Sequence, residues 1–232
     1  MKNKKITSKT SSKILILPIT IALLTMVIVT VVPSVYANAT CDGTGNHCYS
    51  NAKRNTSNRG GSATIYINSG NTVQSGYAIA NPVWINFLDG SWLEAGWQKG
   101  NILPCSSTTA KFYTYEKVSS GSGICVGTTS GSTMSAQITD SNLDGVWQIY
   151  VNGALKQSVF KSTNSNKMTV GGESTHLSNV LTGGRDTNLT IISTSGISSS
   201  WGSTIVPTYS SHLHNYVYAW NTQYTDFTYG GP

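Results

Sequence analysis

The sequence predicts an all-β protein, in which a single domain forms an antiparallel β-sandwich or jelly roll. Runs of alternating apolar and polar residues recur at intervals of roughly 8–12 residues, a spacing typical of this class. Asp89-Gly90 and Asn152-Gly153 between such runs are hairpin turn signals. Charged residues make up only 10% of the chain, and helical periodicity is absent beyond the N-terminal segment. This composition is typical of an extracellular β-protein.

The strands are expected in the following order, each bounded by a turn or loop signal. Ser62–Asn68 alternates and ends at Ser69-Gly70-Asn71, and Thr72–Asn81 leads into Pro82–Leu88. The remaining expected strands are Ser91–Lys99, Ala110–Val118, Ser132–Thr139, Val146–Asn152, Ala154–Phe160, Lys167–Ser174, Asn188–Thr194, Ser203–Ser210 and Asn215–Tyr229. Gly100–Cys105 is expected to be a loop, Cys125–Ser132 a loop or edge strand, and Thr175–Val180 is the one candidate for a short helical turn.

The N-terminal residues 1–37 have the pattern of a secretory signal peptide. Five lysines precede Ile14, an apolar run extends from Ile14 to Val32, and Val35-Tyr36-Ala37 is a small-residue cleavage signal. The run of 19 residues is also near the length that spans a bilayer. We therefore expect a secreted, extracellular protein, or one tethered to the outer face of the membrane by this segment.

The remaining chain is nearly neutral. The whole sequence has a formal net charge of +6, but the part from Asn38 onward holds 10 Lys/Arg and 9 Asp/Glu, a balance of +1 (10 − 9). The basic character belongs to the leader, so no nucleic-acid partner is expected. Residues 38–61 are polar and turn-rich and are expected to be an irregular segment with a small Cys loop, followed by the β-sandwich over 62–232.

Four cysteines lie in the exported part, where an oxidising compartment favours two disulfides over metal ligands. Of the three connectivities, we favour Cys41–Cys48 with Cys105–Cys125, because each bridge closes a local loop. His212 and His214 could place two imidazoles on one face of a strand, but no third residue lies at a spacing typical of a metal-binding motif. No metal or other cofactor is expected.

Glu94 is one of three glutamates in the chain, with Glu116 and Glu173. In the strand Ser91–Lys99, a period of two places Trp92, Glu94, Gly96 and Gln98 on one face. An acid beside a large aromatic residue and a glycine indicates a carboxyl at the floor of a cleft. The alternative is a charged residue on the solvent side of the sheet.

Glu173 follows two glycines, which allow a close backbone approach or a bulge that aims a side chain at a site. A plain loop acid is the alternative. Two glutamates on strands could face each other across a cleft, where their repulsion would raise one pKa and lower the other. Such a pair supplies an acid and a base for hydrolysis of a peptide or glycosidic bond. Glu116, between lysines, has the pattern of a solvated edge.

The segments WINFLDGSWLEAGWQKG, KFYTYE followed by Cys125, VWQIYVNG and TVGGE occur in an order that resembles the neprosin-type glutamic peptidases. The match covers about Gly61 to Glu173, and LEAGWQ and GGE are its sharpest parts. The resemblance implies a β-sandwich with a catalytic pair formed by Glu94 and Glu173. The fungal glutamic peptidases are similar at a greater distance, with a glutamine where Glu94 stands.

The resemblance implies a secreted endopeptidase with a polypeptide substrate. In the expected scheme one glutamate activates a water molecule and the other must keep its proton, which predicts an acidic optimum. Glu173 is assigned as the base and Glu94 as the acid and oxyanion partner. Thr169-Val170 depart from the acid and aromatic residue usual in the family, so subsite preference and proline specificity are not implied. Residues 38–61 alone separate the leader from Ser62, so a long propeptide is not implied either. The candidates for the cleft wall are Trp92, Gln98, Tyr113 and Trp147, for each of which core packing is the alternative.

Two other functions fit the same composition. A glycoside hydrolase would also use two glutamates, and carboxyl separation would distinguish it. A non-catalytic β-sandwich that binds carbohydrate or another surface would use exposed Trp and Tyr side chains instead. Nucleotide binding and a serine nucleophile are not indicated, because neither a phosphate-binding glycine loop nor a Gly-x-Ser-x-Gly segment is present. A monomer is expected.

Overall fold

The computed structural model describes residues 47–68, 70–118, 121–176, 179–202, 208–211, 217–220 and 226–231 of the 232-residue chain. The chain divides into two units, Met1–Val35 and Tyr36–Pro232, and every described residue belongs to the second. The leader, Cys41, His212 and His214 lie outside the described residues, so the predictions made for them stay predictions. In the described part of the chain, no helix has the length and apolar character needed to cross a membrane.

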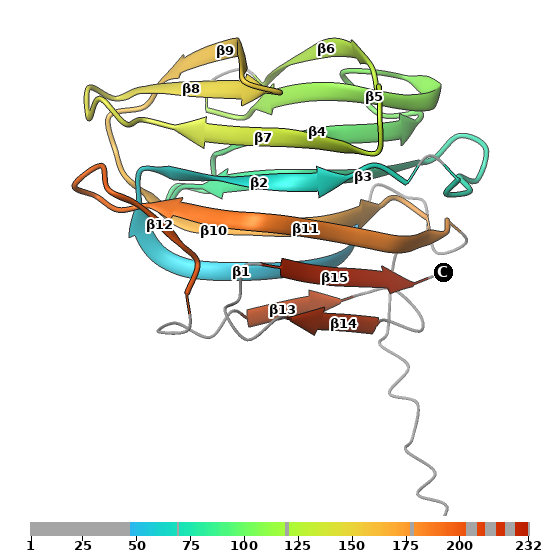
Figure 1. Ribbon diagram of the computed structural model, residues 1–232. Helices are drawn as coiled ribbons and strands as arrows, with labels where there is room; N and C mark the ends of the chain where they lie inside the picture. Colours follow the sequence, from blue (N-terminus) through green and yellow to red (C-terminus); the bar gives the residue numbers. More distant parts are fainter. Residues whose placement is uncertain are drawn as a thin grey trace, which may run out of the picture. The chain divides into compact units, whose positions relative to one another are not determined.

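The described residues form strands and no helix, so the predicted all-β class is confirmed (Figure 1). The strands are β1 Cys48–Asn58, β2 Gly60–Tyr66, β3 Ala78–Asn86, β4 Trp92–Gly100, β5 Ser107–Glu116, β6 Ser122–Thr128, β7 Thr133–Thr139, β8 Val146–Val151, β9 Ala154–Phe160, β10 Ser165–Ser174, β11 Leu181–Ile192, β12 Ser198–Ser200, β13 Thr208–Ser211, β14 Val217–Trp220 and β15 Asp226–Gly231.

Two antiparallel sheets build the sandwich. One has the strand order β13-β1-β10-β3-β4-β5-β6, and the other has the order β14-β15-β11-β2-β7-β8-β9, with β12 paired to β11. The hairpins predicted at Asp89-Gly90 and Asn152-Gly153 join β3 to β4 and β8 to β9. The candidate helical turn at Thr175–Val180 is not helical in its described residues.

The core lies between the sheets and is formed by alternate residues of the strands. On β4 the inward residues are Leu93, Ala95 and Trp97, all buried, whereas Trp92 and Glu94 on the opposite face are partly exposed. The alternation predicted from the sequence is therefore confirmed. The second sheet contributes the buried side chains of Ile65, Met134, Ile138, Trp147 and Ile149 to the same core.

Strand β1 differs from the prediction that Cys48–Gly61 belongs to an irregular segment. It is an 11-residue strand that pairs with β10 on one side and β13 on the other. Its sequence lacks an apolar alternation because its inward positions hold Ser50, Ala52 and Arg54, and its outward positions are polar. The strand is defined by its pairing rather than by its own hydrophobic pattern.

The disulfide Cys105–Cys125 is present, as predicted, and links the loop before β5 to β6. Cys48 is also disulfide-bonded, and Cys41 is its expected partner outside the described residues. Glu116 differs from its expected place, because it is buried, with an exposed fraction of 4%. Its carboxylate accepts hydrogen bonds from the Val118 backbone at 2.7 Å and the Ser122 hydroxyl at 3.1 Å.

Candidate active site

A pocket covers the outer face of the first sheet, on strands β1, β10, β3, β4 and β5. The strand registers align three rows of outward residues that run from β5 to β1: Tyr115, Glu94, Trp84, Thr169, Lys53; Tyr113, Gly96, Pro82, Gly171, Asn51; Lys111, Gln98, Ala80, Glu173, Tyr49. Aligned residues point to the same side of a sheet. Glu94 and Glu173 therefore share one face, although 79 residues (173 − 94) separate them in the sequence.

The middle row keeps the floor of the pocket low between the two glutamates. A side chain at Gly96 would lie 2.3 Å from the Asn81 carbonyl oxygen, and one at Gly171 would lie 2.4 Å from that of Ser50. Gly171 also has φ +126°, a conformation that favours glycine. Gly171, two residues before Glu173, thus has the role expected from the sequence, since it allows β1 and β10 to approach closely.

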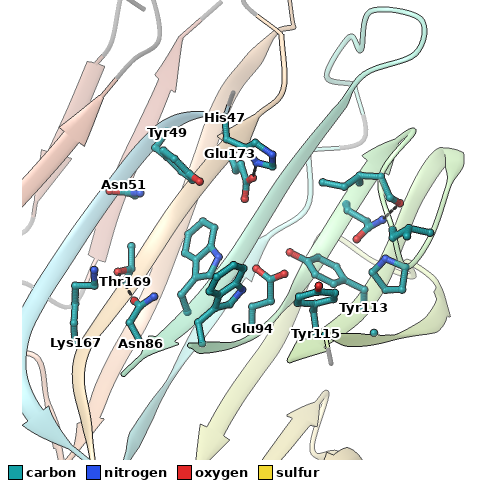
Figure 2. A pocket seen from close by; sticks show the side chains of 18 of the residues that line it. His47, Tyr49, Asn51, Asn86, Glu94, Tyr113, Tyr115, Lys167, Thr169 and Glu173 are labelled. Atoms are coloured by element: carbon teal, nitrogen blue, oxygen red, sulfur yellow. Dashed lines mark hydrogen bonds and ion pairs between the residues drawn. The ribbon is translucent and has the colours of Figure 1, made fainter. Parts of the chain in front are cut away.

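The pocket has a volume of about 950 Å³, at the upper end of the range usual for ligand sites, about 300–1,000 Å³. Both candidate catalytic residues line it, and Figure 2 shows their carboxyls directed into it. With the usual strand spacing, their backbones are separated by about 10 Å across the sheet and about 13 Å along it. A substrate and a water molecule have room between them.

Glu94 lies between Trp84 and Tyr115 on the neighbouring strands. Part of the residue faces the pocket, but its carboxyl is enclosed by these aromatic neighbours, and this desolvation raises the pKa of Glu94 to about 8. The Trp84 indole donates a hydrogen bond to the carboxyl, which favours the ionised form but does not outweigh burial. Glu94 is therefore a protonated carboxylic acid at acidic and neutral pH.

Glu173 has a different environment. It is buried, with an exposed fraction of 8%, and its carboxyl contacts Nδ1 of His47, a residue 126 positions earlier in the chain. A single proton lies between the two groups. Either the ring N–H donates to the ionised carboxylate, or the protonated carboxyl donates to the ring nitrogen. Burial lowers the pKa of His47. The two glutamates thus differ because of their surroundings, and the mutual repulsion expected from the sequence is not among the causes of the Glu94 shift.

Three of the four residues predicted for the cleft wall line the pocket: Trp92, Gln98 and Tyr113. Gln98 also anchors the neighbouring loop, because its amide donates to the carbonyls of Ile102 at 2.7 Å and Cys105 at 3.1 Å. The hydroxyl of Tyr113 is directed toward Glu94 (Figure 2), and burial raises the pKa of Tyr113 well above its ordinary value, with a further contribution from Glu94.

Trp147, the fourth of these residues, lies in the core and does not line the pocket, so the prediction for it is wrong. It is fully buried on β8 of the second sheet, with its ring edge against Phe87 at a centroid distance of 5.1 Å. Its indole nitrogen donates to the Lys161 carbonyl at 2.9 Å. A period of two puts Trp147 on one face of its strand with Ile149 and Val151, so the alternation itself favours the core, which was the alternative for this residue.

Other pocket residues were missed. His47 and Tyr49 come from the segment expected to be irregular, and Trp84 comes from the strand that pairs with the Glu94 strand. The rings of Tyr49 and Trp84 meet edge to face at 6.3 Å. A two-residue turn at Asp89-Gly90 would put Ile85 opposite Glu94. The structure has a three-residue loop, in which the Phe87 N–H donates to the Ser91 carbonyl at 2.9 Å, and this register places Trp84 opposite Glu94 instead. The sequence holds no signal for the position of His47.

The raised pKa of Glu94 predicts a pH-dependent stability. Between pH 4.5, its ordinary value, and about 8, the folded state binds this proton and the unfolded state does not, so the free energy of unfolding falls as pH rises. We expect the free energy of unfolding to fall by about 2 kcal/mol between pH 5 and 8. This is less than the whole pKa shift would give, because part of the residue is exposed to solvent. Chemical denaturation at both pH values measures this loss, and Glu94→Gln should lack it. An equal loss in the variant would contradict the assignment.

No cluster of His, Cys, Asp and Glu that could hold a metal ion occurs among the described residues.

Comparison with known proteins places the fold in a defined class. No protein-family model and no curated protein matches the sequence. The described fold, however, matches that of solved glutamic peptidases.

The first of these is scytalido-glutamic peptidase with a transition state analog inhibitor, with a TM-score of 0.58 and 12% identity over 79% of this chain and 98% of that chain. A structure of the same peptidase with a peptide-based analog has a TM-score of 0.55, 13% identity and coverage of 79% and 98%. SCP-B, an eqolisin-family peptidase in complex with the tripeptide Ala-Ile-His, has a TM-score of 0.51, 13% identity and coverage of 80% and 98%. At this identity the likeness concerns the fold.

Proposed function

We propose that the protein is a glutamic endopeptidase, which hydrolyses peptide bonds with Glu94, Glu173 and a water molecule. The observation that carries this proposal is the position of both glutamates in one pocket of a glutamic peptidase fold. Because the solved neighbours bind a peptide or a transition state analog in their structures, a polypeptide is the substrate class that fits best. Export through residues 1–37 and a closer relation to the neprosin-type branch belong to the same proposal.

The two environments suggest the roles. Glu173, ionised beside His47, accepts a proton from the water, whose oxygen attacks the carbonyl carbon of the scissile bond. Glu94, protonated because it is buried, donates a hydrogen bond to the oxygen on which negative charge develops. The C–N bond then breaks, and the leaving amine takes the proton from Glu173. Both carboxyls return to their initial state at the end of the cycle.

This scheme sets the upper pH limit of activity. Glu94 must keep its proton, and its pKa of about 8 keeps it protonated well beyond the acidic range. The proton on Glu94 therefore does not by itself produce the acidic optimum expected from the sequence. That optimum depends instead on the ionisation of Glu173 and on the unfolding of the substrate protein at low pH. We expect activity to extend from acidic to neutral pH and to fall as pH rises through about 8.

The test is digestion of a denatured protein by the purified protein between pH 2 and 9, with the fragments identified by mass spectrometry. New peptide termini at defined sequences are the expected result. A protein that is folded by circular dichroism but cleaves nothing at any pH would contradict the proposal. Hydrolysis of a polysaccharide, or binding to a glycan array, would then support the glycosidase or the binding module.

His47 is expected to act as a positioning residue for Glu173. His47→Ala removes the partner of a buried carboxyl, and we expect kcat/KM to fall about tenfold with the acid limb of the pH profile moving to higher pH, because the ionised carboxylate loses a donor. His47→Asn keeps a donor near the position of Nδ1 and should restore most of the activity. A pH profile of kcat/KM for the three proteins checks this. An unchanged acid limb in His47→Ala would exclude the role.

A further inference from the structure

The pocket carries positive charge at one end and apolar side chains at the other. Two of the seven lysines that follow the leader, Lys53 on β1 and Lys167 on β10, line it. At the opposite end the lining is apolar and aromatic, with Leu103, Pro104 and Tyr115. Leu103 is 78% exposed at this edge. Figure 2 shows Lys167 on the far side of Glu94 from Tyr113 and Tyr115.

The two lysines lie close to each other. Lys53 is paired with Thr169, two residues from Lys167 on the neighbouring strand, so their backbones are diagonal neighbours at about 7–8 Å. Burial lowers the pKa of Lys53, and the charge of Lys167 lowers it further. Two like charges that share a partly buried position repel each other, and a bound anion would relieve this repulsion.

Carboxylates of the described residues do not neutralise this pair. Glu173 contacts His47, Glu116 accepts from Val118 and Ser122, and the ion pairs of Asp89 and Asp140 are with Lys161 and Arg59. Glu94, in the same row as Lys53, is protonated. The groups beside the lysines are neutral: Asn51, Asn86 and Thr169, whose hydroxyl donates to the Asn86 side-chain oxygen at 3.3 Å.

We propose that Lys53 and Lys167 form a basic subsite that binds an acidic side chain of the polypeptide substrate. This inference rests on the proposed function and gives it a substrate class: segments with aspartate or glutamate near the scissile bond. Three strand spacings separate Glu94 from Lys53, about 14 Å, which corresponds to about four residues of an extended chain. The acidic side chain therefore lies within about four positions of the bond that is cleaved, on the side away from Leu103.

Paired peptides that differ only by glutamate or glutamine at each position around one cleavage site test the subsite. At pH 6 the glutamate side chain of the peptide is ionised. We expect kcat/KM to favour glutamate about tenfold at one position, as for a charge-assisted contact. In Lys53→Gln/Lys167→Gln the ratio of kcat/KM for the glutamate peptide to kcat/KM for the glutamine peptide should fall to about one. In Lys53→Glu/Lys167→Glu the preference should turn to lysine at the same position.

Lys156→Gln is the matched control, because this lysine lies on β9 of the other sheet and does not line the pocket. It should keep the full glutamate preference. Equal cleavage of the paired peptides by the unaltered protein, or an unchanged preference in the double variant, would overturn the subsite and leave the peptidase proposal standing.

If the protein cleaves no peptide, the proposed function fails, and peptide binding still tests the subsite. Trp84 and Trp92 line the pocket, so their fluorescence should report occupancy. Tighter binding of the glutamate peptide that is lost in Lys53→Gln/Lys167→Gln would support the basic subsite without catalysis. Equal binding of both peptides would overturn it.

Discussion

Replacing Glu173 with glutamine is expected to reduce kcat/KM for peptide cleavage by about 10³ or more. The substitution keeps the size of the side chain but removes the group that accepts the proton from water, a function that contributes typically about 10²–10⁴. Because the side chain is buried against His47, no solvent carboxylate can replace it. Steady-state cleavage of one peptide at pH 5 measures the loss.

Glu116→Gln is the control for this experiment, since Glu116 is the third glutamate of the chain and does not line the pocket. Glutamine at this position can still accept the hydrogen bond from the Val118 backbone. The Glu116→Gln protein should therefore keep peptide cleavage if it folds. Activity near the unaltered level in a folded Glu173→Gln protein would remove Glu173 from the mechanism.

The second large effect is expected at Glu94, where two substitutions separate its roles. Glu94→Ala removes the donor to the developing oxyanion and should lower kcat by about 10²–10³, the usual effect of losing one such donor. Glu94→Gln keeps a donor at this position, so we expect a loss of only about tenfold. The difference depends on the pKa of about 8, which makes the native residue a donor at the working pH.

The comparison of kcat for the two Glu94 variants with one peptide measures this difference. Circular dichroism shows whether Glu94→Ala folds, and binding of a peptide to it shows whether the pocket is intact. Equal loss in Glu94→Ala and Glu94→Gln would indicate that proton transfer, not hydrogen bonding, is the contribution of Glu94. Full activity in Glu94→Ala would exclude it from the site.

The sequence predicted the parts of the fold that local chemistry determines. Asp89-Gly90 fixed a hairpin, and the alternation of Ser91–Lys99 placed Glu94 and Gln98 on the outer face and Trp97 in the core. Cys105–Cys125 closes a loop of modest length, so this disulfide could also be predicted from the sequence. These features depend on residues that are near each other in the chain.

The rest depends on pairings between distant strands. Strand β1 is recognisable only from its partners β10 and β13, because its polar residues line a pocket on one face. The contact of His47 with Glu173 follows from that pairing, and no local pattern announces it.

The raised pKa of Glu94 also has a cause that the sequence could not show. Repulsion between two carboxyls that face each other across a cleft was expected to raise one pKa and lower the other. In the structure, the enclosure of Glu94 between aromatic side chains raises its pKa, and Glu173 has its own partner in His47. Burial of a specific atom is a property of the folded chain.

The most direct test of the proposed mechanism is the pH dependence of kcat/KM for one peptide, measured for the unaltered protein and for Glu94→Gln between pH 3 and 10. We predict that activity of the unaltered protein falls as pH rises through about 8, the pKa of Glu94, and that this descending limb is absent from Glu94→Gln. The same descending limb in both proteins would contradict the role of Glu94 as the protonated member of the pair.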